Sequence, residues 1–316
     1  MMYQFFDLVE LWQSNPEWIK SMLTELLTML GDKTIEPLNV TVFPLAKSED
    51  AFRFMARAMH IGKVVIKHPA PVEPVALSAE GCYLVTGGYG GIGLQTAMWL
   101  VKKGARNICV LSRRAAAPES ALKALRTEAS DVRLIAAQGD VAVLADVRGA
   151  IQKILTLGLT LRGVVHSAGL TNDKATMESS WEDFQGVLGV KVQGALNLHT
   201  ETLGMQLDLF VLYSSTSGML GNMGQASYAA ANAYLDGLCH YHHSLGLPAL
   251  AVIWGPWADV RMAAAMKNAA ALGLTKEKTI PPSTGIHLLE LTLMEQQPHF
   301  AIFPAVSCRW RPDPPR

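Results

Sequence analysis

The chain has 316 residues, of which 50% are hydrophobic and 17% are charged, so it can bury the core of one large domain or of a domain with a smaller module. Lysine plus arginine and aspartate plus glutamate both number 27, which excludes a charge excess favouring nucleic acid or an anionic membrane. The opening MMYQFFDLVELW has no basic flank, so we expect no secretory signal. The longest apolar runs are shorter than the ~20 residues that span a bilayer, and we expect a soluble, cytoplasmic protein.

Residues 1–68 differ in pattern from the rest of the chain. The second of two expected helices places Phe52, Met55 and Met59 on one face, at i, i+3/i+4 spacing. Residues 69–80 are rich in proline, a composition typical of a linker. The elements expected here are an apolar helix over about Glu17–Leu30, a helix over Glu49–Met59 and a strand over Gly62–Lys67.

From Gly81 onward, apolar strand-like runs alternate with helical segments. The expected strands are CYLVT, NICVL, VRLIAAQ, LRGVVH, DLFVLYSS, ALAVIWG and HFAIFPA. This alternation predicts an α/β fold, a doubly wound parallel sheet of the Rossmann type with helices on both faces, preceded by a small α+β extension. Of four scattered cysteines, Cys82 and Cys109 fall inside strand-like runs, and all four are expected to be reduced.

A glycine-rich turn, VTGGYGGIG, joins the first of these strands to a helix. Glycines let the backbone approach a pyrophosphate, and the helix N-terminus offers free N–H groups. The spacing Thr-Gly-x-x-x-Gly-x-Gly is the short-chain reductase variant of this fingerprint. The cofactor-binding residues expected in the turn are Thr86, Gly87, Gly88, Tyr89, Gly90, Gly91, Ile92 and Gly93.

The second strand ends in LSRR, which contains Ser112, Arg113 and Arg114. Enzymes that use NAD usually place an acidic residue there to hold the ribose 2′-hydroxyl. Arginines could instead clamp a 2′-phosphate through charge-assisted hydrogen bonds. Arginines after a strand can also be simply solvated, but together with the glycine-rich turn they indicate NADPH.

A set of polar residues fits the reduction of a ketone. A tyrosine can protonate the developing alkoxide if a nearby ammonium lowers its pKa from about 10. Tyr228 and Asn232 share a helix face at i, i+4, where most short-chain reductases have lysine instead of asparagine. Ser215 ends a strand at the carboxyl edge and could hold the carbonyl oxygen. Lys191 lies upstream in an otherwise apolar helix.

These motifs resemble the ketoreductase domains of polyketide synthases and of animal-type fatty acid synthases, in which the catalytic lysine and asparagine exchange positions. The resembling segments are VTGGYGGIG, LSRR, VVHSAG, KVQGALNLH, FVLYSS, GQASYAAANAYLD and WGPWA, and they span Gly81 to about Ala305. The resemblance implies a short-chain dehydrogenase/reductase fold and NADPH-dependent reduction of a β-ketoacyl thioester on an acyl carrier protein. Nucleic acid and membrane are not expected as partners.

The resemblance also assigns roles to residues. Tyr228 would donate the proton and Ser215 would hold the carbonyl oxygen. Lys191 would lower the pKa of the tyrosine, and Asn232 would support the lysine or a water of a proton relay. Further cofactor contacts implied by the family are Asp140, Val141, Ser167, Ala168 and Gly169.

Stereochemistry is encoded in this family by two short signatures. B-type domains carry a Leu-Asp-Asp motif after the HxAG strand, and of this motif only Asp173 is present here. A-type domains carry a tryptophan eight residues before the tyrosine, where this chain has Leu220. We therefore expect B-type reduction to a D-configured 3-hydroxyl. Trp257 and Met262 match the family's substrate lid, although a helix of alanine and methionine could equally be packing.

Residues 1–68 resemble the C-terminal end of the enoylreductase domains of the same synthases, without the nucleotide loop of such a domain. The expected organisation is thus an enoylreductase remnant (1–68), a linker (69–80), a ketoreductase catalytic domain (81–305) and a tail (306–316). The structural subdomain that normally buttresses a ketoreductase is not recognised, so the chain resembles a piece of a megasynthase whose other domains would be its partners.

Alternatives remain open at this point. The chain could reduce a free small ketone, or it could be a non-catalytic module that binds a nucleotide or a partner. The cluster CHYHH offers Cys239 and His243 at i, i+4 as metal ligands, but no second ligand pair accompanies them, so no metal site is expected.

Overall fold

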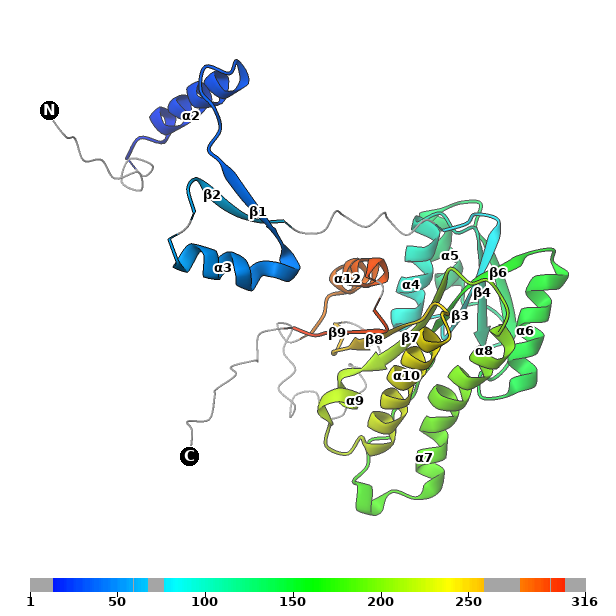
Figure 1. The fold of residues 1–316 in the computed structure, drawn as a ribbon. Coiled ribbons are helices and arrows are strands. Elements are labelled where there is room, and N and C mark those ends of the chain that lie inside the picture. Colours follow the sequence, from blue (N-terminus) through cyan, green and yellow to red (C-terminus); the bar gives the residue numbers. More distant parts are fainter. Residues whose placement is uncertain (1–13, 59, 68–76, 259–278, 296, 305–316) are drawn as a thin grey trace, which may run out of the picture. The chain divides into compact units, whose positions relative to one another are not determined.

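The computed structural model describes residues 14–58, 60–67, 77–258, 279–295 and 297–304 (Figure 1). The chain divides into two compact units, Met1–Val72 and Glu73–Arg316, and each is described by itself. No helix within these described ranges is long and apolar enough to cross a membrane.

The N-terminal unit is built around a two-stranded parallel sheet. Phe54 packs on Phe43 with ring centroids 5.7 Å apart, and Ala51 is buried, so these residues face the strands. Of the three residues expected on one face of this helix, Phe52 and Met55 are exposed, and Met59 lies outside the described residues. The elements of the N-terminal unit are α2 (Pro16–Gly31), β1 (Val40–Pro44), a 3₁₀ turn (Leu45–Lys47), α3 (Ser48–Ala56) and β2 (Lys63–Lys67).

The larger unit contains a seven-stranded, fully parallel sheet with the order β5-β4-β3-β6-β7-β8-β9. This order reverses between β3 and β6, which is the switch point where doubly wound sheets bind nucleotides. The predicted α/β fold is confirmed. The strands are β3 (Gly81–Thr86), β4 (Asn107–Ser112), β5 (Arg133–Gln138), β6 (Thr160–His166), β7 (Leu209–Ser215), β8 (Leu250–Trp254) and β9 (His299–Ile302).

Helices cover both faces of this sheet (Figure 1). Alternate residues of β3 show why, because Cys82 and Leu84 enter one core while Tyr83 and Val85 enter the other. The first core is closed by α6 (Leu144–Thr156), α8 (Gly194–Thr202) and α10 (Ala226–Ser244), and the second by α4 (Gly91–Lys102), α5 (Glu119–Glu128) and α12 (Pro282–Met294). Of the cysteines, Cys82, Cys109 and Cys239 are buried and unpaired, and Cys308 lies outside the described residues.

The segment between β6 and β8 supplies most of the polar residues considered below. It contains a 3₁₀ turn (Thr176–Glu178), α7 (Trp181–Leu188), a π-helical turn (Gly189–Gln193) and α9 (Thr216–Leu220). A capping box starts α7, because the Ser180 hydroxyl accepts from the Asp183 N–H while the Asp183 carboxylate accepts from the Ser180 N–H. The π turn, which the sequence did not predict, widens the helix where Lys191 projects.

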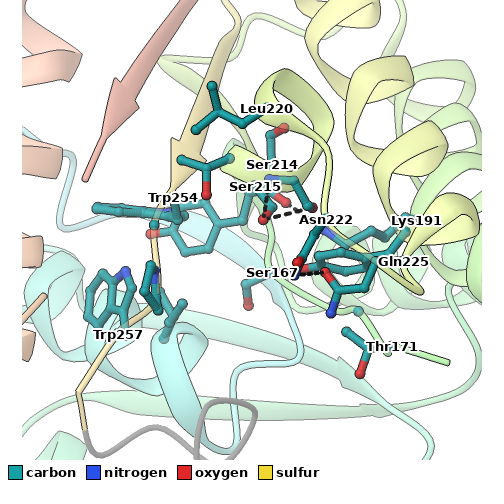
Figure 2. Close-up of a pocket in the computed structure, with 18 of the residues that line it drawn as sticks. Ser167, Thr171, Lys191, Ser214, Ser215, Leu220, Asn222, Gln225, Trp254 and Trp257 are labelled. Atoms are coloured by element: carbon teal, nitrogen blue, oxygen red, sulfur yellow. Dashed lines mark hydrogen bonds between the residues drawn. The ribbon is translucent and has the colours of Figure 1, made fainter. Parts of the chain in front are cut away.

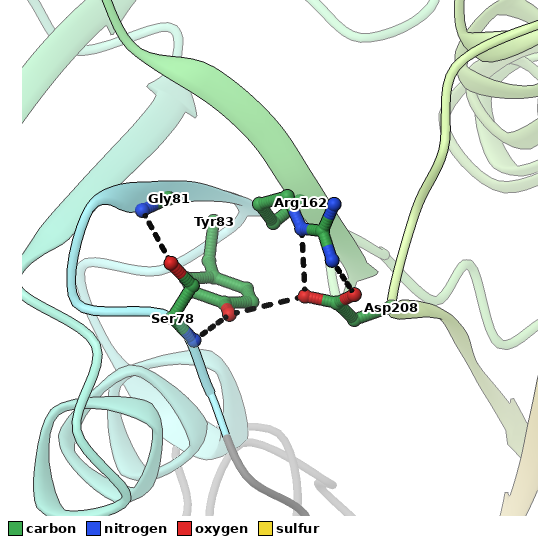
Figure 3. A network of polar contacts seen from close by, with 5 residues as sticks. All are labelled: Ser78, Gly81, Tyr83, Arg162 and Asp208. Carbon is green, nitrogen blue, oxygen red and sulfur yellow. Dashed lines mark hydrogen bonds and ion pairs between the residues drawn. The ribbon is translucent and has the colours of Figure 1, made fainter.

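A polar network closes the opposite, amino-terminal edge of the sheet (Figure 3). The Tyr83 hydroxyl accepts from the Ser78 N–H at 2.9 Å and faces Asp208 at 3.5 Å. Arg162 donates to both oxygens of Asp208. Since Ser78 also accepts from the Gly81 N–H at 3.1 Å, the network fixes the chain where it enters β3.

Candidate active site

A cavity of about 310 Å³ opens at the carboxyl ends of the strands, beside the switch point (Figure 2). Three of the four predicted catalytic residues, Lys191, Ser215 and Tyr228, line it. They come from the π turn, the end of β7 and the first turns of α10. The fourth, Asn232, is fully buried one turn behind Tyr228. Residues 191, 215 and 228, which are distant in sequence, therefore meet at one cavity.

Tyr228 is 8% exposed, and its environment decides its protonation. Burial raises the pKa of Tyr228, while hydrogen bonding to the side chains of Asn232 and Ser215 acts in the opposite direction. The expected lowering of the tyrosine pKa by lysine is not seen, because desolvation dominates. Tyr228 is consequently held in its protonated form, the state from which it can act as an acid.

Ser215 sits at the junction of β7 and α9. Its hydroxyl accepts from the Ser217 N–H at 3.3 Å and lies 3.0 Å from the Ser217 hydroxyl (Figure 2). The backbone of Ser215 is extended, so this residue is both the last residue of β7 and the N-cap of α9. These contacts fix the hydroxyl at the cavity wall, where it can donate to a ligand oxygen.

Lys191 is only 4% exposed, which is unusual for a lysine. Its Nζ donates to the Tyr213 carbonyl at 2.7 Å and lies 5.2 Å from the centre of the Tyr228 ring. Burial lowers the pKa of Lys191 to about 7, and the negative charge of Asp236 acts against this change. The Lys191 side chain therefore converts between its ammonium and neutral amine forms near neutral pH.

Asn232 connects α10 to β7. Its side-chain Nδ2 donates to the backbone carbonyl of Tyr228 at 2.7 Å, and its backbone carbonyl accepts from the Ser214 hydroxyl at 3.2 Å. Its Oδ1 is buried and has no hydrogen-bond partner among the described residues. An acceptor of this kind is free to hold a water or a ligand donor.

The glycine-rich turn is closely packed against the end of β6. Gly87 has a φ of +72°, which favours glycine, and a Cβ on Gly93 would lie 2.6 Å from the Gly87 carbonyl oxygen. The Ser167 hydroxyl donates to the Thr86 carbonyl at 2.6 Å, and the Ala168 N–H donates to the Thr86 hydroxyl at 3.2 Å. The turn and the HSAG segment are thus one structure, with the N-terminus of α4 beside it.

The other predicted cofactor residues lie along the same edge of the sheet. The Ser112 hydroxyl accepts from the Arg114 N–H at 3.2 Å. Arg113 and Arg114 are exposed, and in the described parts of the chain no side chain or carbonyl binds either guanidinium. The Asp140 N–H donates to Asp146 at 2.7 Å, which fixes the loop after β5. A glycine cradle with two unpaired guanidinium groups at the end of β4 suits a phosphorylated dinucleotide.

Val141, Gly169, Tyr89 and Ile92 complete the predicted cofactor set. The Val141 carbonyl accepts from Asn197 at 2.9 Å, which ties this loop to α8. Gly169 and Ile92 line the cavity, whereas Tyr89 packs its ring against the core on the α4 side.

The proposed stereochemical residues are divided between the cavity and the surface. Asp173 accepts from the Gln225 Nε2 at 2.9 Å, and Gln225 lines the cavity although the sequence did not single it out. Leu220 also lines the cavity and is 70% exposed at its mouth. Trp257 is buried in the cavity wall, and Met262 lies outside the described residues.

The histidine cluster at the end of α10 is part of the packing. His243 contacts the Ala249 carbonyl at 2.8 Å, and Cys239 is buried in the core. Within the residues that the structure describes, no group of three or more metal-ligating side chains is assembled.

Comparison with known proteins identifies the larger unit. The family model described as KR domain matches residues 81–259. The chain is 33% identical over 305 residues to a component of the phenolphthiocerol/phthiocerol polyketide synthase of Mycobacterium tuberculosis, covering 94% of this chain and 14% of that protein. It is 35% identical over 282 residues to squalestatin hexaketide synthase of Phoma sp., covering 85% and 11%. The chain therefore spans only about a seventh or less of these relatives.

Solved structures give the same picture. A ketoreductase from the first module of phoslactomycin biosynthesis in Streptomyces sp. HK803 superposes with a TM-score of 0.67 at 31% identity, covering 75% of this chain and 55% of that one. A structure of A-type ketoreductases from a modular polyketide synthase superposes with a TM-score of 0.64 at 34% identity, covering 74% and 48%.

Proposed function

The chain belongs to the KR-domain family, the ketoreductases of polyketide synthases, and from this premise we propose that it reduces a β-ketoacyl thioester on an acyl carrier protein, using NADPH. As a KR domain it is a nicotinamide-dependent reductase of the Rossmann type. The observation that carries the proposal is the meeting of Tyr228, Ser215 and Lys191 at one cavity beside the glycine-rich turn.

The residues of the cavity divide the chemistry among them. Bound NADPH would supply the hydride that the carbonyl carbon accepts. The Ser215 hydroxyl would donate a hydrogen bond to the carbonyl oxygen as negative charge develops there. Tyr228, kept protonated by burial, would transfer its proton to that oxygen, and the Lys191 ammonium beside the ring would stabilise the resulting tyrosinate.

NADPH rather than NADH is supported by the end of β4. Arg113 and Arg114 are exposed there, and no acidic residue stands in the LSRR segment. Guanidinium groups bind phosphate dianions with charge-assisted hydrogen bonds, which the 2′-hydroxyl of NADH cannot match.

The carrier-bound substrate is supported by the relatives, which are polyketide synthases several times longer than this chain. Other domains of such a synthase would deliver the acyl chain, and we propose that residues 1–68 derive from an enoylreductase domain beside the ketoreductase. The parallel β1–α3–β2 arrangement is compatible with that origin, because parallel sheets occur in larger α/β bodies.

We further propose B-type reduction, giving a D-configured 3-hydroxyl. Asp173 is held at the cavity through Gln225, and Leu220 stands where A-type domains carry tryptophan. Chiral analysis of the product tests this point, and a product of L configuration would refute it.

The proposed activity is tested by following NADPH oxidation with a β-ketoacyl thioester of a carrier protein and with a free small ketone. Turnover of the carrier thioester is expected, with a loss of about 10²- to 10⁴-fold in Tyr228→Phe. Preference for the free ketone would contradict the carrier proposal. NADPH binding without any turnover by the wild type would favour a non-catalytic role.

A further inference from the structure

His166, the last residue of β6, lies between Thr86 at the start of the glycine-rich turn and Lys191 in the π turn. It is only 1% exposed, and both of its ring nitrogens meet polar atoms. Its Nδ1 lies 2.8 Å from the Thr86 hydroxyl, and its Nε2 lies 3.3 Å from the backbone carbonyl of Lys191. One buried side chain therefore joins the predicted cofactor cradle to the residue that carries the ammonium.

The proton on this ring is placed by its neighbours. Burial and the charge of Lys191 lower the pKa of His166 to about 3, so the ring is neutral near pH 7. A carbonyl only accepts hydrogen bonds, so the single ring proton is on Nε2 and is donated to the Lys191 carbonyl. Nδ1 is then an acceptor, and the Thr86 hydroxyl donates to it. The hydroxyl oxygen in turn accepts from the Ala168 N–H, so each group in this series of hydrogen bonds has one defined role.

The π turn leaves the Lys191 carbonyl in need of this donor. The Gly194 N–H is shared between the Gly189 and Lys191 carbonyls, so the helix gives the Lys191 carbonyl only part of one donor. Gly194 also lets the turn approach the ring, because a Cβ there would lie 3.2 Å from His166 Cε1 and 2.9 Å from Val141 Cγ1. The ring is therefore packed against the π turn as well as hydrogen-bonded to it.

The side chain of Lys191 is held from two strands. Gly169, three residues after His166, leaves room for it, since a Cβ on this glycine would lie 3.0 Å from Lys191 Cε. At its tip, the ammonium donates to the Tyr213 carbonyl at 2.7 Å and lies 5.2 Å from the centre of the Tyr228 ring. The Lys191 backbone is thus held by the end of β6 and its ammonium by β7. A displacement of the backbone would move the ammonium relative to Tyr228.

We propose that His166 is a positioning residue that sets the Lys191 ammonium against Tyr228 and links this pair to the glycine-rich turn. The inference rests on the proposed function, in which Lys191 stabilises the tyrosinate. Loss of the Nε2 contact should impair catalysis, whereas loss of the Nδ1 contact should impair cofactor binding. A residue needed only for packing would not show two separable effects.

The assigned hydrogen bonds are tested first, without cofactor or substrate. The histidines of the full-length wild type are labelled with ¹⁵N, and the His166 ring is assigned through correlations with its own backbone. Long-range ¹H–¹⁵N spectra at neutral pH then show which ring nitrogen carries the proton. We expect the neutral form with the proton on Nε2. A proton on Nδ1, or on both nitrogens, would overturn the proposal, and this result requires neither activity nor a variant.

Two substitutions of similar shape separate the two contacts. In His166→Asn the side-chain amide reaches only the place of Nδ1, so the contact with Thr86 is kept and the contact with Lys191 is lost. Its kcat should fall about 10- to 100-fold, because a small displacement of a catalytic group has effects of this size. Its Kd for NADPH should stay close to that of the wild type.

The second substitution should give the opposite pattern. In His166→Gln the amide nitrogen takes the place of Nε2 and can donate to the Lys191 carbonyl, whereas the Thr86 hydroxyl loses its acceptor. Most of kcat should be recovered, and NADPH should bind about 2- to 10-fold more weakly, as expected for the loss of one hydrogen bond. Equal effects of the two substitutions on kcat and on Kd would overturn the proposal.

His242→Asn is the matched control for damage to packing. His242 is also buried and pairs with His199 at 2.7 Å, but it lies at the end of α10 away from Tyr228. This variant should unfold at a lower urea concentration than the wild type, with kcat and Kd unchanged while it is folded. If His166→Asn loses activity only in proportion to its loss of folded protein, the proposal is overturned.

An inactive wild type would refute the proposed function but not the link through His166. In that case the ¹³C signal of the Lys191 ε-carbon replaces kcat as the readout. The signal should move in His166→Asn and stay near its wild-type position in His166→Gln. The same displacement in both variants, or in neither, would overturn the positioning role.

Discussion

Replacing both Arg113 and Arg114 with alanine removes the two guanidinium groups that follow β4. Both side chains are exposed, and neither is bound by another group in the described part of the chain. Their removal should therefore leave the fold intact and change only what the end of β4 can bind.

The magnitude follows from this exposure. A hydrogen bond to a charged group contributes about 1.5–3 kcal/mol, and solvent screening reduces this to about 1 kcal/mol for each exposed arginine. The double variant should thus bind NADPH about 2 kcal/mol more weakly, or roughly 30-fold in Kd. Binding of NADH, which has no 2′-phosphate, should change little.

Isothermal titration with NADPH and NADH measures both affinities on the full-length chain. A matched control replaces Arg126 and Arg133 with alanine. Arg133 begins β5 at the amino-terminal edge of the sheet, Arg126 lies beside it in the last turn of α5, and their removal changes the net charge equally. Equal weakening of NADPH and NADH, or equal effects of the two double variants, would refute the assignment of Arg113 and Arg114 to the 2′-phosphate.

Three further changes have defined outcomes. Gly93→Ala should abolish nucleotide binding and lower the free energy of unfolding by about 1–3 kcal/mol, because a Cβ there overlaps the glycine-rich turn; wild-type affinity would contradict this. In urea, Tyr83→Phe should cost about 1 kcal/mol, since the Ser78 N–H loses its acceptor, whereas Tyr241→Phe on the surface should cost almost nothing. The rate of reduction should fall as the pH rises through about 7, where Lys191 loses its proton, and a rate that is flat to pH 9 would refute this.

Much of the site could be predicted because its residues lie in local motifs. The strand–glycine turn–helix pattern, the end of β7 and the i, i+4 pair on α10 are all visible in the sequence, and parallel strands bring their carboxyl ends to one edge. Tyr228 and Ser215 could therefore be placed at a common site from the order of the strands alone.

Other features depend on tertiary neighbours and could not be predicted. The π turn that carries Lys191 lies between α7 and α8 in the chain, and nothing in GVKVQ signals it. The direction of the Tyr228 pKa shift depends on how deeply the ring is buried, which a motif does not record. In the N-terminal unit, the spacing of Phe52 and Met55 was compatible with a buried face, but the strands pack against Phe54 instead.

The most direct test of the account is the fate of the hydride and the proton in one product. The full-length chain would be given a β-ketoacyl thioester of a carrier protein and NADPH deuterated at C4, and the product would be analysed by mass spectrometry. We expect a β-hydroxyacyl thioester with deuterium at C3 from the wild type, and almost none from Tyr228→Phe although this variant still binds NADPH. Equal product from both proteins, or no product from the wild type, would contradict it.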